Sequence, residues 1–345
     1  MAISNAGNWI VPEHSAKALP ENPEKMSEEI KNLLQSARAA QGAIVATDSD
    51  GGVRYALPAS TARGISIDLN ASVAPNVAAL FNSEGHLRAS PKGRPAVADF
   101  TLSALDIARA HSRCVAAGAL LFVREEPLPP RRIGTGPELP VFAREVHGLS
   151  VVRPLPMAVV ADSADAVVAT ALPVASASVD WTEQSSTPSY GATLEIPRND
   201  YRDRLHNGTL EELLHAAILA GVGRIADKAV LAALGAASLA NFSLANAASA
   251  GHQFSELRGI VGTTGAGAVV GADGVLRVAG VAAELTDSTT GTFIGDFSRS
   301  AIVLDREVRI VADRSSRESA LKLSVFAGAA ALVPDAQRNF WRVAA

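Results

Sequence analysis

The sequence predicts an α+β protein with one long helix and a C-terminal series of strands. Residues 209–234 place apolar side chains at alternating three- and four-residue spacing, as one face of a helix requires. Residues 291–328 contain three apolar runs with the pattern of strands. The chain between these two segments is rich in Ala, Gly and Ser. With 345 residues, the protein is long enough for two domains or for one large domain with an appendage.

Composition and charge restrict the class of protein. Hydrophobic residues make up 48% of the chain, charged residues 19%, and the net charge is -4, which predicts a globular protein rather than a disordered chain or a general nucleic-acid binder. The single cysteine, Cys114, excludes an intrachain disulfide, and we interpret it as a buried thiol. No apolar stretch approaches the ~20 residues of a membrane helix, so we expect no membrane contact and synthesis in the cytoplasm.

The N-terminal part of the chain predicts an arm followed by a small added unit. Residues 1–40 lack periodicity at first and then place apolar side chains at helical spacing after Ser27, which indicates an extended arm ending in a short helix. Residues 41–130 predict an accessory α+β domain. It contains a hairpin at an Asp-Gly-Gly turn, a helix over residues 102–117 and the buried strand "ALLFV".

Residues 131–208 predict a linker and a projecting loop. The linker is rich in proline, which is incompatible with regular structure. The section from Asp162 to Pro197 is polar and β-prone, with apolar and polar side chains alternating near its end. A Ser/Thr/Pro tract lies within it, and we expect this tract to be the exposed tip of a projecting two-stranded loop.

The long helix is the clearest single element. Thr209 and Glu212 match a capping box, and the apolar pattern continues to Gly235, so the helix would span about 40 Å at 1.5 Å per residue. Gly221 and Gly223 are a candidate soft point. The helix buries its apolar side chains only if another layer covers them. These side chains are Leu210, Leu213, Leu214, Ala217, Ile218, Ile225 and Ala229.

After this helix, the sequence predicts a small Gly/Ala-rich domain over residues 236–290 and a β segment over residues 291–345. The first of these contains a predicted helix around Phe254 to Ile260 and a predicted strand around Val275 to Val278. The second contains the three apolar runs, and Asp305-Arg306 supplies a turn between two of its strands.

The patterns that carry catalysis, cofactors or metals are not found. Seven histidines are scattered without an HExxH motif or a histidine pair at metal-ligand spacing, and no GxSxG motif occurs. The glycine-rich segment 262–274 lacks the Gly-Lys-Ser/Thr ending of a phosphate loop. We therefore expect a non-enzymatic protein with no catalytic, cofactor or metal site. A nucleotide-binding enzyme that uses Gly265 and Gly267 remains an alternative.

The order of these parts and the wording of the C-terminal segments resemble a known family. "IGDFSRSAIVLDREVRI" is followed by the closing segment "SALKLSVFAGAAALVPDAQRNFWRVA". Together with the arm, loop and long helix before them, they resemble tailed-phage major capsid proteins of the Hong Kong 97 type. The resemblance implies a Hong Kong 97-type capsid fold. It has a spine helix over 209–235, a small axial domain over 236–290, a peripheral-domain β segment over 291–345 and a projecting β-hairpin loop.

The same resemblance implies a function. The chain would self-assemble through pentamers and hexamers into an icosahedral shell that encloses the double-stranded DNA of a tailed phage without sequence-specific binding. It would assemble in the host cytoplasm, reside in the virion, and have portal, scaffolding or decoration proteins as further partners. An encapsulin-type nanocompartment that encloses cargo protein remains an alternative. The structural and interface candidates are Leu210, Leu213, Leu214, Ile218, Ile225, Trp181, Asp296, Phe297, Arg299, Arg306 and Arg309.

One departure from the family concerns covalent stabilisation. Some relatives join neighbouring subunits by a Lys-Asn isopeptide bond, with the lysine in the projecting loop. This sequence has no lysine between Lys92 and Lys228. We therefore expect a shell that is held together by non-covalent contacts.

Overall fold

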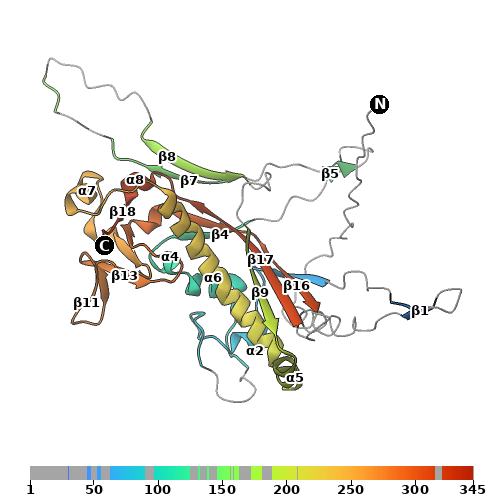
Figure 1. The fold of residues 1–345 in the computed structure, drawn as a ribbon. Helices are drawn as coiled ribbons and strands as arrows, with labels where there is room; N and C mark the ends of the chain where they lie inside the picture. Colours follow the sequence, from blue (N-terminus) through green and yellow to red (C-terminus); the bar gives the residue numbers. More distant parts are fainter. Residues whose placement is uncertain are drawn as a thin grey trace, which may run out of the picture.

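The computed structural model places one long helix against a central sheet, with a second sheet at one end and a ribbon that projects from the body (Figure 1). It confirms the α+β class. The described residues are 30, 45–47, 53–55, 63–89, 97–124, 131–132, 138–139, 146–155, 157, 159–162, 172–180, 189–207, 209–314 and 321–344. Among them, no helix combines the length and apolar character needed to cross a bilayer.

The predicted long helix is confirmed as α6, which runs unbroken through 27 residues, Leu210–Ala236. The predicted capping box is wrong, because Thr209 has helical backbone angles and its side chain makes no capping hydrogen bond. A second helix, α5 (Arg198–His206), comes directly before it, and the Thr209 amide donates to the Arg204 carbonyl at 3.2 Å. Thr209 therefore stands at the N-cap position of α6 without using its side chain as a cap.

The central sheet is organised around its longest strand, β17 (Leu321–Leu332). The predicted C-terminal strands form here as β15 (Ala301–Leu304) and β16 (Glu307–Arg314), both antiparallel to β17. Asp305 and Arg306 join them as predicted, and the Asp305 amide donates to the Gly328 carbonyl at 2.8 Å. The sheet order is β3-β16-β17-β15-β4, and β9 also pairs with β17.

One face of this sheet packs on α6 and forms the main core. Leu219, Ala226 and Leu234 of the helix have no exposed surface or almost none, and they belong to the same buried cluster as Ile302 and Leu304 of β15. Burial of apolar surface on this scale is the principal stabilising term in folding. The C-terminal strands therefore supply a layer that covers the long helix, as its apolar side chains require.

The described residues of the expected accessory domain belong to the same body as the central sheet. Strand β3 (Arg63–Asp68) pairs antiparallel with β16, and β4 (Leu120–Val123) pairs parallel with β15, so both extend the central sheet. The short helix α2 (Pro75–Ala78) and the helices that follow it pack toward α6 and share its buried cluster. The predicted hairpin is found as β1 (Val45–Thr47) paired with β2 (Val53–Tyr55). Of the N-terminal arm and its helix, only Ile30 lies within the described residues.

Close contact between α3 (Ala104–His111) and α6 explains one of the two helix glycines. A Cβ atom at Gly223 would collide with the carbonyl oxygen of Ala108 and with His111. The other glycine, Gly221, has nothing within 4 Å among the described residues. Gly223 is thus a packing position, and the helix continues without a break at the expected soft point.

The helix predicted over residues 102–117 is split in two at Ser112. Its second part, α4 (Arg113–Ala116), begins where the buried Asp227 of α6 accepts three hydrogen bonds. These come from the Ser112 hydroxyl at 2.7 Å and from the amides of Cys114 at 2.8 Å and Arg113 at 2.9 Å. Burial, followed by the charge of Asp227, raises the pKa of the Cys114 thiol, in agreement with its interpretation as a buried, unreactive group.

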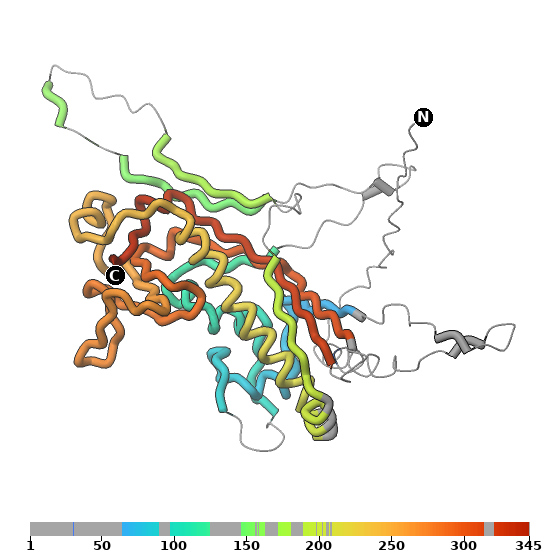
Figure 2. The backbone as a smooth tube through the Cα atoms, viewed as in Figure 1, coloured from blue at the N-terminus to red at the C-terminus, as the bar shows by residue number. Residues whose placement is uncertain are grey.

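The projecting ribbon differs from the predicted loop in its strand pairing. Strand β7 (Val146–Val152) pairs along its whole length with β8 (Val174–Asp180), and Figure 2 shows the two strands side by side. The expected partner of β8, strand β9 (Ser189–Ile196), pairs with β17 instead and buries Ile196 opposite Leu321. The residues of the expected tip, 181–188, lie outside the described residues. The linker contributes one two-residue pair, β5 (Arg131–Arg132) with β6 (Glu138–Leu139).

The second sheet has the order β11-β12-β13-β10-β14-β18. The predicted helix near residues 254–260 is wrong, because a 3-10 turn, η1 (Phe254–Glu256), is followed directly by β10 (Arg258–Val261). Ile260 and Val261 are both fully buried, which suits a strand covered on two faces. The remaining strands are β11 (Ala268–Val270), β12 (Leu276–Val278), β13 (Val281–Leu285), β14 (Phe293–Gly295) and β18 (Phe340–Arg342).

The second sheet crosses the expected boundary at residues 290 and 291. β14 and β18 were expected in the peripheral β segment, yet β14 pairs with β10 and β18 pairs with β14. Helix α7 (Leu244–Ser249) covers this sheet with its own buried cluster, which includes Trp341. The C-terminal segment therefore contributes strands to both sheets.

Replacing two leucines of α6 by alanine should distinguish its buried face from its exposed face by the loss of stability. Leu219 is fully buried, whereas Leu213, expected on the buried stripe, is 38% exposed. We expect Leu219→Ala to lower the free energy of unfolding by about 2–5 kcal/mol, because it removes buried methyl groups and leaves a cavity. Leu213→Ala should cost under about 1 kcal/mol. Equal losses in urea unfolding of the two variants would contradict this assignment of faces.

The buried His215 of α6 should make stability depend on pH. Burial lowers the pKa of this imidazole to about 4, and neither ring nitrogen has a hydrogen-bond partner among the described residues. The unfolded chain takes up a proton near pH 6.5, whereas the folded chain does not until near pH 4. Stability is therefore lost as the pH falls through this window, by on the order of 3 kcal/mol for this group.

The measurement is urea unfolding at several pH values between 7 and 4. His215→Leu should give a shallower loss of stability over this range than the unsubstituted chain, because it removes one proton uptake from the unfolded state. Parallel pH profiles for the two proteins would show that His215 does not carry this dependence.

Candidate contact surface and the junction of the two sheets

The projecting ribbon is anchored on the face of the central sheet that lies opposite α6. All four residues of β15 are fully buried. Ile302 and Leu304 belong to the cluster that includes α6, while Ala301 and Val303 form a separate cluster that the ribbon covers. Successive residues of a strand point to opposite faces, so the sheet is covered on both sides at this point. The ribbon residues in this second cluster are Leu149, Ala177 and Val179.

Beyond this anchor, the ribbon exposes aliphatic side chains. Met157 is 87% exposed and Leu172 82%, and the neighbouring side chains of the same extension are also largely open to solvent. A monomeric soluble protein seldom gathers large apolar side chains on a projecting segment unless a partner covers them. We call this surface the apolar extension. It consists of Val152, Leu155, Met157, Val159, Val160, Leu172 and Val174.

The predicted helix candidates divide between core and surface. Leu210 and Leu214 are buried in the main cluster, as expected. Ile218 and Ile225 are partly buried and pack against that cluster, whereas Leu213 is exposed. Four of the five predicted residues of α6 therefore pack in or against the main core, and Leu213 faces solvent.

The predicted Asp and Arg candidates make contacts within the chain. Arg306 forms an ion pair with Asp68 of β3, with Nη2 and Oδ2 at 2.7 Å and Nε within 3.2 Å of both carboxylate oxygens. Such a two-point contact fixes the connection between β15 and β16 to the sheet edge. Arg309 is exposed on β16 opposite Phe326, which is also exposed. Trp181 lies outside the described residues.

Asp296 lies at the junction of the two sheets. It follows β14 of the second sheet and caps the 3-10 turn η2 (Phe297–Arg299), which leads into β15 of the central sheet. Its Oδ1 atom accepts from the amide and the hydroxyl of Ser298, and its Oδ2 atom accepts from Arg299 Nε at 2.8 Å. Phe297 is fully buried edge-on against Phe340. These two candidates therefore have a structural place inside the subunit.

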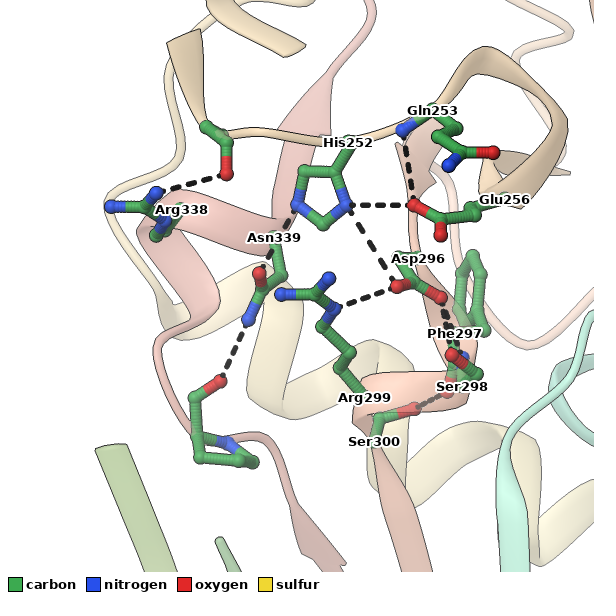
Figure 3. Close-up of polar contacts among 12 residues, drawn as sticks. His252, Gln253, Glu256, Asp296, Phe297, Ser298, Arg299, Ser300, Arg338 and Asn339 are labelled. Carbon is green, nitrogen blue, oxygen red and sulfur yellow. Dashed lines mark hydrogen bonds and ion pairs between the residues drawn. The ribbon is translucent and has the colours of Figure 1, made fainter. Parts of the chain in front are cut away.

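A buried histidine faces this carboxylate from the second sheet. Figure 3 shows the ring of His252 between Asn339 on one side and the carboxylates of Asp296 and Glu256 on the other. The Asn339 amide donates to the Pro334 carbonyl, so its Oδ1 atom faces His252 Nε2 at 3.2 Å and that nitrogen carries the proton. His252 Nδ1 lies 3.8 Å from Asp296 Oδ2 and 3.9 Å from Glu256 Oε2.

The electrostatics of this group leave the imidazole neutral at pH 7. Burial and then the charge of Arg299 lower the pKa of His252, and the two carboxylates offset this only in part. Sequence reasoning missed this group, although Asp296 was singled out for another reason. His252 and Glu256 are four residues apart, which is a weak signal by itself, and Asn339 is far away in the sequence.

Comparison with known proteins finds similar structures only among solved structures. No family model matches the chain, and no curated protein matches it. Three solved structures resemble it with TM-scores of 0.38 or 0.39. The capsid of the native GTA particle shares 11% identity over 74% of this chain and 96% of that one. The satellite phage P4 procapsid shares 11% identity, and the match covers 70% of this chain and 96% of that one. The virus-like particle of Pyrococcus furiosus shares 8% identity, and the match covers 70% of this chain and 96% of that one.

These structures are a capsid, a procapsid and a virus-like particle, which is the class of protein that the sequence resemblance named.

Proposed function

We propose that the chain is the repeating subunit of a closed protein shell, and more specifically the major capsid protein of a tailed phage. The observation that carries the proposal is the apolar extension. It is anchored on the central sheet at one end and exposes Met157, Val159 and Leu172 beyond any core of its own. We assign a second copy of the chain as the partner that covers it.

The architecture supports a second copy as that partner. A rod of 27 residues and a sheet whose strand β15 is covered on both faces give a rigid body, from which the ribbon reaches outward. Stable contacts between subunits typically bury ~800 Å² on each partner, and a ribbon adds such area without a larger core. If each ribbon covers a neighbour's body, the contact is head-to-tail, and it closes into rings when the rotation allows.

We further propose a division of the subunit that follows its two sheets. The peripheral part comprises α6 with the central sheet, and the axial part comprises the second sheet with α7. In this proposal five and six copies group around their axial parts. Portal, scaffolding or decoration proteins are the further partners, the host cytoplasm is the place of assembly and the virion is the destination.

We propose a structural rather than catalytic role for the glycine-rich segment. Gly265 and Gly267 have φ values of 64° and 71°, which glycine adopts without steric penalty. The Ala268 amide donates to the Gly265 carbonyl, and a Cβ atom at Gly267 would collide with Val343. The turn into β11 therefore accounts for these glycines without a bound phosphate.

Assembly and content are tested on the purified chain after expression without other phage proteins. Electron microscopy should show uniform hollow particles, because the contacts between copies are built into the chain. A chain that stays monomeric at high concentration and also enters no particle during infection would overturn the shell proposal. Particles produced during infection should protect double-stranded DNA from nuclease, whereas an enclosed protein and no DNA would favour a nanocompartment.

A substitution in the apolar extension tests its role directly. Val152 is 69% exposed, so Val152→Glu should leave the subunit folded while placing a charge in the buried contact. We expect particles to give way to small soluble species in light scattering, with an unchanged circular dichroism spectrum. The matched control, Val152→Ile, keeps an apolar β-branched side chain and should assemble normally. Normal particles from Val152→Glu would show that this residue lies outside any contact.

A further inference from the structure

Three potential metal ligands from separate elements meet at the junction of the two sheets. His252 follows α7, Glu256 lies in η1, and Asp296 lies between β14 and η2. Their ligand atoms all lie within 4.8 Å of one another. In the part of the chain that the structure describes, no other group of three or more such side chains is arranged this way.

His252 leaves one buried ring nitrogen facing two carboxylates. Its side chain has no exposed surface, and its Nδ1 atom has no hydrogen-bond partner among the described residues. Because Nε2 carries the proton, the Nδ1 lone pair points toward two carboxylate oxygens, and three electron-rich atoms converge. An unpaired buried acceptor is costly, so a group that binds all three atoms would stabilise the arrangement.

The spacing fits a metal ion better than direct hydrogen bonds. The separations of 3.8 and 3.9 Å exceed the length of a hydrogen bond between nitrogen and oxygen. Two ligands on a tetrahedral zinc ion stand about 3.4 Å apart, given bonds of about 2.0–2.1 Å, so each of these two separations would have to close by about half an ångström. Glu256 is 40% exposed, which gives an ion a route from solvent.

The surroundings also have the features of a metal site. Asn339 accepts from Nε2 and holds the ring so that Nδ1 faces the carboxylates, as outer partners of metal-binding histidines do. Arg299 opposes an ion because it donates to Asp296 Oδ2, yet two carboxylates against one guanidinium still leave a net negative charge.

We propose that His252 Nδ1, Glu256 Oε2 and Asp296 Oδ2 bind one divalent transition-metal cation of the zinc class. A nitrogen ligand and two carboxylates suit such an ion better than magnesium or calcium, which prefer oxygen ligands alone. The ion would connect the segment after α7 to the turn that joins the two sheets. The site is complete within one chain and does not depend on assembly.

Zinc binding by the chelator-treated chain tests the proposal. Titration calorimetry should detect one zinc ion per chain at this site, and zinc should raise the melting temperature because it binds only the folded state. Glu256→Gln should weaken binding at least tenfold, although glutamine can still accept from the Gln253 amide through its carbonyl oxygen. His252→Gln should do the same while keeping a donor near Asn339.

Two matched controls make the same chemical changes elsewhere. Glu195 lies on β9 and His86 is exposed, and neither belongs to the proposed site. The variants Glu195→Gln and His86→Gln should therefore bind zinc as the unsubstituted chain does. An unsubstituted chain with the zinc affinity of Glu256→Gln would overturn the proposal. So would a chain that responds to pH at His252 but not to zinc, because a proton would then supply the positive charge.

Discussion

The central sheet depends on one constraint: β15 must be covered on both faces at once. Ile302 and Leu304 face the side of α6, Ala301 and Val303 face the ribbon, and none of the four has exposed surface. Without α6 the main core loses one wall, and without the ribbon two residues of the sheet interior become open to water. The position of the ribbon therefore follows from the same strand that positions the long helix, and the outward reach of the apolar extension follows from that anchor.

Local pattern predicted the elements of this fold better than their partners. The 3.6-residue period identified α6 almost to the residue, and the three apolar runs gave the C-terminal strands. The partner of β9 could not be read in this way, because a strand that alternates near its end fits equally well against β8 or β17. Thr209 illustrates the same limit, since the capping signal was present and the residue occupies the N-cap position, yet its helical backbone angles leave the side chain without a capping hydrogen bond.

The candidate sites show where sequence reasoning stops. Met157 and Leu172 are of residue types that usually lie in a core, so the sequence does not mark them as exposed. Only the fold shows that nothing in the described chain covers them. The group of His252, Glu256 and Asp296 joins three elements, and the orientation of its imidazole depends on Asn339 near the C-terminus. Asp296 was selected for its place in a strand motif, whereas its chemistry comes from neighbours that no local pattern connects to it.

The parallel pairing of β4 with β15 also bears on synthesis of the chain. Leu120 of β4 pairs with Ala301 of β15, and β3 pairs with β16. These two early strands therefore lack their partners until the final quarter of the polypeptide has emerged from the ribosome. Contacts this distant in sequence slow folding and leave strand edges unpaired in the meantime. A nascent subunit is therefore most vulnerable to aggregation before translation ends, and a chaperone that shields β3 and β4 during that interval would raise the yield of native protein.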